Sequence, residues 1–248
     1  SSAASDVYKR QIIKGSEKTV LGQERAAENK IYCFDGKNTT KWDWIAEIKS
    51  VPDFKCISPK QIDMMISSKN NGFGQGIYVS IPRIKQPIEL FVLFRALGIT
   101  TDKSICEYIV LNIHESKQEK ILNFLTASII DANKYTTCDE AIKYISNYST
   151  YNPINMDKEQ GIQKKQDFTI EILDNDLFPH CKSKKQKIYF LGYMTNKIIR
   201  TALGWEKTND RDSYVNKRIE LTGTLLNNLF RNYFNKLVKE MQKQVIRE

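Results

Sequence analysis

The chain is 248 residues long, with a hydrophobic share of 41% and a charged share of 27%. These values are typical of a folded protein and exclude a disordered, collagenous or disulfide-dense chain. The length accommodates one large domain or two modest ones. The net charge of +9 indicates either a polyanionic partner or a well-solvated lysine-rich surface, and charge alone favours neither. No apolar run approaches the roughly 20 residues that cross a bilayer, so no membrane partner is expected.

Cysteine and histidine usage argues against metal chemistry. The five cysteines are scattered, without the close pairs that metal sites use. With two histidines in the chain, neither a zinc site nor a histidine-based triad is expected. The N-terminus lacks the regions of a secretory signal, so the odd cysteine count predicts free thiols in an intracellular, reducing compartment. The cysteines are Cys33, Cys56, Cys106, Cys138 and Cys181.

Both ends of the sequence have the look of cut ends. The chain does not begin with Met, and the pattern of its last helix continues into Glu248. Residues 1–11 match nothing around them and resemble a translated cloning adaptor, so they are left out of the fold prediction.

The first third of the chain, residues 12–82, is predicted to be rich in strands. Short apolar runs and alternating apolar and polar residues mark the strands. A turn is expected at 14–16, and the glycine-rich cluster at 70–76 is typical of a hairpin turn. The expected strands are 12–13, 19–21, 31–34, 44–49, 61–64 and 77–81.

After Pro87 the apolar spacing becomes helical. Gly98 and Gly204 are placed to end two of the helices, and Asp102 is expected to cap another. Residues 205–218 are polar and charged, which predicts a loop. The predicted class is therefore α+β, with strands first and helices after. The expected helices are 90–97, 102–111, 115–130, 138–149, 163–178, 188–203 and 225–241.

No self-contained active site emerges from the motifs. P-loop, nucleophile-elbow and zincin spacings are all missing, and 72–76 lacks the strand-to-helix setting that cradles phosphates. Asn209–Asp212 has the acidic residues of a magnesium site, but Arg211 between them favours an ion-pair network. His180 is assigned a structural role at a helix end.

Two further features are candidates for nucleic-acid contacts, and for both a structural role is favoured. The lysine-rich run 182–187 is interpreted as the solvated start of a helix, with a phosphate contact or a localisation signal as the alternative. Three nearby aromatic residues lie on or beside an apolar stripe, so core packing is favoured over base stacking. They are Tyr189, Phe190 and Tyr193.

Three segments, in order, resemble the second-largest subunit of multisubunit DNA-directed RNA polymerases. Ile12–Arg25 resembles a strand of that subunit's protrusion. Ile81–Ile88, continued by Leu93–Gly98, resembles a strand-to-helix passage of its lobe. Tyr189–Met194 and then Asp210–Gly223 resemble the return from lobe to protrusion. The ordered set is more specific than any one segment.

The resemblance implies an organisation and a role. Residues 12–22 would end the first protrusion segment, 23–205 would form the lobe, and 206–248 would be an incomplete second protrusion segment. The whole enzyme would synthesise RNA on a DNA template, with catalytic magnesium held by the largest subunit. This chain would carry no catalytic residue, cofactor or metal. Its partners would be the largest and other polymerase subunits, template DNA and the RNA–DNA hybrid.

The resemblance also implies which side chains meet nucleic acid. Lys18 lies on a segment that faces the hybrid in the family, and Gln23 and Arg25 follow at the same-face spacing of a strand, although Lys18 is off that register. Lys217 and Arg218 close a charged loop that faces the cleft. All five are expected to contact phosphates without reading bases. The alternative is that these are solvated surface charges.

Departures from the family pattern suggest a divergent member. Ser213, Val215 and Thr224 stand where cellular members usually carry other residues. A large DNA virus or an AT-rich protist would fit, with a nuclear location if cellular and a virion or viral replication compartment if viral. Two other classes remain open from the residues alone: a stand-alone, non-enzymatic nucleic-acid-binding module, and a helical interaction scaffold.

Overall fold

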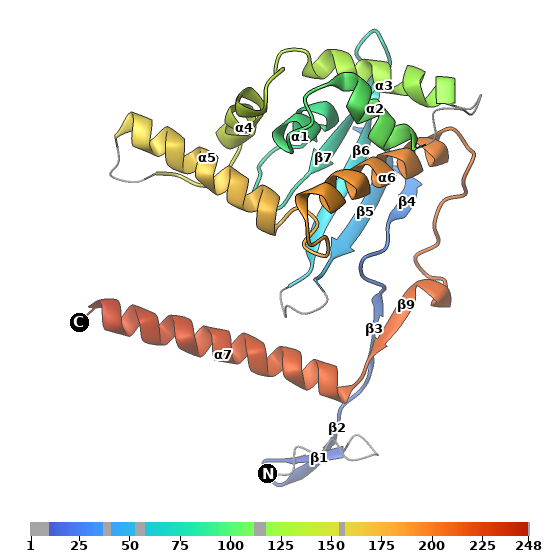
Figure 1. The fold of residues 1–248 in the computed structure, drawn as a ribbon. Coiled ribbons are helices and arrows are strands. Elements are labelled where there is room, and N and C mark those ends of the chain that lie inside the picture. The colour runs from blue at the N-terminus through green and yellow to red at the C-terminus, as the bar shows by residue number, and fades with distance from the viewer. Residues whose placement is uncertain (1–9, 37–40, 53–57, 112–117, 154–156, 248) are drawn as a thin grey trace. The chain divides into compact units, whose positions relative to one another are not determined.

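The computed structural model describes residues 10–36, 41–52, 58–111, 118–153 and 157–247. The chain divides into two compact units (Figure 1). Unit 1 consists of Ser1–Ala27 and Arg211–Glu248, and unit 2 runs from Glu28 to Asp210. Nine residues of the adaptor-like segment lie outside the described part, and its last two, Arg10 and Gln11, belong to the first strand.

Unit 2 contains a five-stranded antiparallel sheet in the order β4-β5-β6-β7-β8. The predicted hairpin turn between β6 and β7 is confirmed. The Asn70 side-chain carbonyl accepts hydrogen bonds from the backbone N–H groups of Gly72 and Gly74, at 2.8 and 2.9 Å. Such a bonded asparagine stabilises a tight turn. The strands are β4 Tyr32–Asp35, β5 Trp42–Ser50, β6 Lys60–Asn70, β7 Gln75–Ser80 and β8 Ile88–Glu89.

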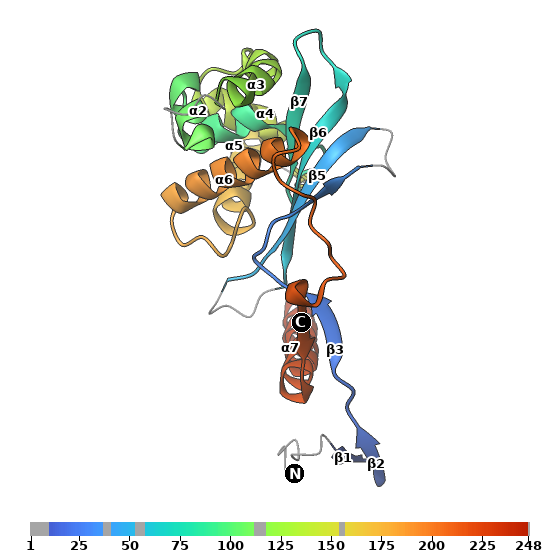
Figure 2. The same ribbon diagram turned by 90° about the vertical axis from the view of Figure 1, so that its right-hand side faces the viewer.

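Six helices follow the strands and gather on one side of this sheet (Figure 2). They confirm the α+β class, although the predicted start of the third helix lies partly outside the described residues. All of the first helix is buried, with Phe91 and Phe94 among the largest enclosed side chains. Among the described helices, none has the length and apolarity of a membrane-spanning segment. The helices are α1 Leu90–Ala96, α2 Asp102–Val110, α3 Gln118–Ala132, α4 Cys138–Asn147, α5 Lys158–Asn175 and α6 Lys184–Ala202.

The predicted helix stops are confirmed, but one predicted cap is wrong. Gly98 and Gly204 follow α1 and α6 with φ of +92° and +73°, a conformation that glycine adopts without strain. Asp102 does not cap α2. Thr101 holds the cap position, and Asp102 is the first helical residue, where its carboxylate binds Arg95 at 2.6 Å.

The lysine run before and within α6 is only partly solvated. Ser183 caps the helix, and Lys184 and Lys185 are exposed as predicted. Lys187 is buried, however, and its ammonium donates to the carbonyl of Leu173 at 2.9 Å and to a neighbouring carbonyl at 2.6 Å. These carbonyls lie at the end of α5, where a cation is favoured by the helix dipole. Burial lowers the pKa of Lys187, and nearby Asp174 opposes that shift.

The core-packing interpretation of the α6 aromatics is right for one residue and wrong for two. Phe190 packs against His180, with ring centroids 4.5 Å apart. His180 is in turn within 2.6 Å of the Ser50 hydroxyl, which supports its structural assignment. Tyr189 and Tyr193 are 47% and 49% exposed. They lie one helical turn apart, so they share one face of α6.

Unit 1 contains a hairpin, a second two-stranded sheet and a long helix. The hairpin β1–β2 turns through Lys14 and Gly15, whose φ values are +51° and +76°, as in a type I′ turn. The predicted strand at 19–21 is displaced, because β2 ends at Thr19. The elements are β1 Arg10–Ile13, β2 Ser16–Thr19, β3 Gln23–Ala26, a 3-10 turn Tyr214–Asn216, β9 Lys217–Glu220 and α7 Thr222–Arg247.

Alkaline pH is expected to destabilise unit 2. Burial raises the pKa of Cys106 and of Cys181 from 9.0 to about 11, and burial with nearby Asp131 raises that of Tyr78 from 10.0 to about 12. Between pH 9 and 12 the unfolded chain therefore loses these protons first, and stability falls as pH rises. The urea midpoint of tryptophan fluorescence should drop between pH 8 and pH 10.5, and Tyr78→Phe should lessen the drop. A constant midpoint would contradict this.

Candidate nucleic-acid interface

Strand pairing in unit 1 brings together four of the five residues predicted to contact nucleic acid. β3 pairs with β9 in antiparallel register, although almost two hundred residues separate the two strands in sequence. Gln23 and Arg25 lie on β3, and Lys217 and Arg218 lie on β9. The last two therefore belong to a strand, and the predicted loop at 205–218 is wrong at its end.

One face of this small sheet carries both arginines. Arg25 and Arg218 are directly opposite in the register, and Gln23 is opposite Glu220. Paired residues and alternate residues share a face, so all four side chains lie on the same side. Two cations placed opposite each other repel. Glu220 offsets that repulsion, because its carboxylate is 2.7 Å from Arg25 Nε.

The two arginines are differently exposed. The Arg25 side chain is 34% exposed and the Glu220 side chain 18%, so their ion pair is partly shielded from water. Arg218 is exposed and donates to the carbonyls of Val215, at 3.2 Å, and of Lys217, at 2.8 Å. A guanidinium has five N–H donors, so these two bonds leave Arg218 with donors for an anionic ligand.

Lys217 is on the other face of the sheet. Its neighbour in the register is Ala26, and adjacent residues of a strand point to opposite sides. The Lys217 ammonium lies 3.5 Å from the carboxylate of Asp212, which is 94% exposed. Lys217 and Arg218 therefore cannot meet the same stretch of nucleic-acid backbone from one face of the sheet.

Lys18 is on a third surface. It lies on β2, is exposed, and pairs in register with Gln11 of β1. β2 and β3 belong to different sheets, with Val20–Gly22 between them. This break explains why Lys18 is out of register with Gln23 and Arg25.

The segment Asn209–Asp212 before β9 makes hydrogen bonds and an ion pair with other residues of this chain. Asn209 exchanges hydrogen bonds with the backbone of Cys33, at 2.8 and 2.9 Å. Asp212 pairs with Lys217, as the predicted ion-pair network requires. In the described ranges, no group of three or more histidine, cysteine or acidic side chains is arranged to hold a metal ion.

Sequence reasoning missed Glu220 and the β9 strand. The alternation Lys217-Arg218-Ile219-Glu220 is compatible with a strand. Three of these four residues are charged, and such a composition is also compatible with a loop. The backbone hydrogen bond from Ala27 N–H to the Asn216 carbonyl, at 2.8 Å, extends the pairing of β3 with β9 by one residue. No local sequence pattern predicts this pairing.

Comparison with known proteins identifies the family. Residues 27–220 match the family model described as RNA polymerase Rpb2, domain 2. The DNA-directed RNA polymerase II subunit RPB2 of Encephalitozoon cuniculi is 35% identical over 94% of this chain and 20% of its own length. The RNA polymerase II subunit 2 of Arabidopsis thaliana is 30% identical over the same shares.

An archaeal relative extends the comparison beyond eukaryotes. The DNA-directed RNA polymerase subunit Rpo2 of Sulfolobus acidocaldarius is 29% identical over 94% of this chain and 19% of its own length. The chain thus spans about a fifth of the length of the curated relatives it matches. As the ordered segments predicted, this chain belongs to the family of the second-largest subunit of multisubunit RNA polymerases, and corresponds to one part of that subunit.

Proposed function

We propose that this chain forms part of the wall along the nucleic-acid cleft of a DNA-directed RNA polymerase. Unit 2 would be the lobe, and unit 1 would be two pieces of the protrusion. The observation that carries the proposal is the pairing of Arg25 with Arg218 on one face of the β3–β9 sheet. Two arginines on one face of a sheet suit the phosphates of a nucleic-acid backbone, which arginine binds without reading sequence.

The rest of the enzyme would supply the chemistry. Template-directed RNA synthesis would take place at magnesium ions held by the largest subunit. The chain would assemble with the largest and other polymerase subunits around template DNA and the RNA–DNA hybrid. In a cellular eukaryote the location would be the nucleus, and in a virus it would be the virion or replication compartment.

The surface of α7 supports the assignment of unit 1 to a larger domain. Leu229, Phe230 and Tyr233 are each more than half exposed, and apolar residues continue along the helix to Ile246. A contiguous apolar surface of this kind is normally covered by protein. We propose that other parts of the same subunit cover it in the assembled polymerase.

The salt dependence of DNA binding tests the proposed phosphate contacts. In the assembled polymerase, Arg218→Gln should flatten the slope of log K against log salt by roughly 0.7–0.9, because one phosphate contact is lost. Arg25→Gln should have a smaller effect, since Glu220 already neutralises part of its charge. Binding is measured by anisotropy of labelled template DNA over a series of KCl concentrations.

Lys217→Gln is the matched control for this experiment. It removes one positive charge from the adjacent residue on the opposite face, so the slope should not change. Lys18→Gln tests, in the same measurement, whether Lys18 on the β1–β2 hairpin contacts a phosphate. An unchanged slope in Arg218→Gln would refute the proposed face, and a change in Lys217→Gln alone would assign the contact to the other face.

A further inference from the structure

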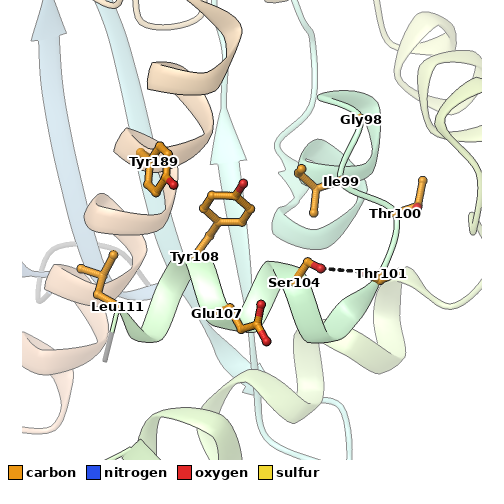
Figure 3. A pocket seen from close by; sticks show the side chains of 9 residues that line it. All are labelled: Gly98, Ile99, Thr100, Thr101, Ser104, Glu107, Tyr108, Leu111 and Tyr189. Atoms are coloured by element: carbon orange, nitrogen blue, oxygen red, sulfur yellow. Dashed lines mark hydrogen bonds between the residues drawn. The ribbon is translucent and has the colours of Figure 1, made fainter. Parts of the chain in front are cut away.

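Two surface cavities of unit 2 meet at the side chain of Tyr189. The first has a volume of about 480 Å³ and lies between the start of α2 and the exposed side of α6. Figure 3 shows Tyr108 rising from α2 between Tyr189 and Ile99. The Tyr108 and Tyr189 rings make an edge-to-face contact, with centroids 4.9 Å apart. Such a contact fixes the orientation of the Tyr189 ring.

The floor of the first cavity is polar. Thr100, Thr101 and Ser104 contribute hydroxyl groups, and Glu107 contributes a carboxylate. The Thr101 hydroxyl donates to Ser104 Oγ at 2.7 Å, drawn as a dashed line in Figure 3. This cavity therefore offers hydrogen-bond acceptors to backbone N–H groups or to polar side chains of a ligand.

The second cavity is mainly apolar. It has a volume of about 490 Å³ and is lined by Tyr189, Phe190 and Tyr193 of α6 together with His180, Cys181 and the amide residues Asn29 and Gln186. Phe190 and His180 are held by their mutual ring contact. None of the described residues that line this cavity carries a carboxylate. Its rigid aromatic walls suit one or two large apolar side chains.

Exposed lysines lie at the start of α6, beside this pair of cavities. Lys184 and Lys185 are exposed in the first turn of α6. The Lys184 ammonium lies 3.9 Å from the position of a Cβ on Gly98, at the rim of the first cavity. Lys182 precedes the helix, and its side chain is also exposed. The rim therefore carries a positive potential that attracts acidic groups.

We propose that the two cavities beside Tyr189 form a docking site for a short acidic segment of a partner protein. Apolar side chains of the segment enter the cavity lined by Phe190 and Tyr193, and its carboxylates face Lys184 and Lys185. Backbone N–H groups of the segment donate to the hydroxyls and to Glu107 in the first cavity. The site lies in unit 2 and is independent of the phosphate contacts proposed for unit 1.

A peptide fits this surface better than single-stranded nucleic acid does. Nucleic acid would need a basic track along its backbone and free aromatic faces for its bases. The lysines gather at one end of α6, and the Glu107 carboxylate in the first cavity would repel phosphates. A peptide tolerates Glu107, because it can place an uncharged residue or an N–H donor there.

Peptide selection on the 248-residue chain tests the proposal. Random peptides of about 12 residues, long enough to hold anchors spaced as far as i and i+7, are displayed on phage and selected on the wild-type chain. The recovered peptides should be enriched in aspartate or glutamate together with leucine or aromatic residues. Synthetic copies are then titrated by fluorescence anisotropy, in parallel with a single-stranded oligo(dT) of about 15 nucleotides.

Two variants and two matched controls locate the binding. Tyr189→Ser with Tyr193→Ser, and separately Lys184→Glu with Lys185→Glu, should each weaken peptide binding by at least about tenfold. Lys158→Glu with Lys164→Glu makes the same charge change on the exposed side of α5. Phe73→Ser removes an aromatic residue that is 63% exposed elsewhere in unit 2. Both controls should bind within about twofold of wild type.

Several results would overturn the proposal. Failure to enrich any peptide, or enrichment of peptides without acidic residues, would exclude an acidic partner. Equal binding by the lysine variant and its α5 control would exclude this surface, even if the tyrosine variant failed to fold. Binding of oligo(dT) that is lost in the same variants, without peptide binding, would make the surface a nucleic-acid site.

Discussion

Gly192→Ala is expected to destabilise unit 2 by about 3 kcal/mol, at the upper end of the cost of overpacking. Gly192 lies in the middle of α6, where that helix crosses α2. A Cβ added there would stand 2.3 Å from the carbonyl oxygen of Tyr108 and 2.9 Å from its carbonyl carbon. Ordinary contact begins at 3.4 Å. Because the Tyr108 atoms are backbone, they cannot rotate away as a side chain would. The clash is removed only if α2 and α6 move apart, which a close-packed core resists.

Tryptophan fluorescence measures this loss in the relevant unit. All three tryptophans, Trp42, Trp44 and Trp205, belong to unit 2. The urea midpoint of their fluorescence therefore reports unit 2 without a contribution from unit 1. A decrease in midpoint with an unchanged m-value would show lost stability rather than a change in the unfolded state.

Gly161→Ala is the matched control. Gly161 is also helical, in α5, but a Cβ there would meet the Pro153 ring at 3.1 Å rather than backbone. The helix gains roughly 0.5–1 kcal/mol from the change to alanine, which offsets a small shift of the ring. We expect its effect to stay within about 1 kcal/mol in either direction. Equal effects of the two substitutions would contradict the close helix crossing at Gly192.

The elements that depend on local pattern were predictable from the sequence. Gly98 and Gly204 end helices because their backbone angles suit glycine. The 70–76 hairpin follows from the hydrogen-bonding preferences of asparagine and glycine. The α+β class follows from the change in apolar period after Pro87. In each case the cause lies within a few residues of the feature.

Features that depend on distant partners were not predictable in this way. The register that sets Arg25 opposite Arg218 joins a segment that precedes unit 2 in the sequence to one that follows it. In the sequence, Lys187 belongs to a lysine run that is predicted to be solvated. In the fold it is buried, because carbonyls at the end of α5 accept hydrogen bonds from its ammonium group. Tyr189 and Tyr193 fall beside an apolar stripe, yet both side chains are about half exposed. Of the candidate site, the residue types were predictable, but their division between two faces of a sheet was not.

Arg95 is a further residue whose role required the fold. Its side chain is 3% exposed, and its guanidinium donates to the carbonyls of Ala132, at 2.5 Å, and Tyr135, at 2.6 Å. Ala132 is the last residue of α3, where helical carbonyls lack intrahelical partners. A second nitrogen of the group binds Asp102 at the start of α2. One buried side chain on α1 thus joins the end of α3 and the start of α2.

Arg95→Met is expected to cost unit 2 about 3 kcal/mol, because two carbonyls in a mainly buried site lose their donor, at about 1–3 kcal/mol each. Methionine preserves most of the side-chain length, so the loss reflects hydrogen bonding more than cavity formation. The urea midpoint of tryptophan fluorescence is again the measurement.

Asp102→Asn separates the carbonyl contacts from the ion pair. The Asp102 side chain is 39% exposed, so solvent screens its attraction to Arg95, and an asparagine oxygen still accepts the same hydrogen bond. This substitution should cost about 1 kcal/mol or less. The cost of Arg95→Lys should fall between the costs of Arg95→Met and Asp102→Asn, because an ammonium cannot reproduce the planar guanidinium that reaches three acceptors. A loss in Asp102→Asn as large as that in Arg95→Met would mean that the ion pair, and not the end of α3, is what Arg95 stabilises.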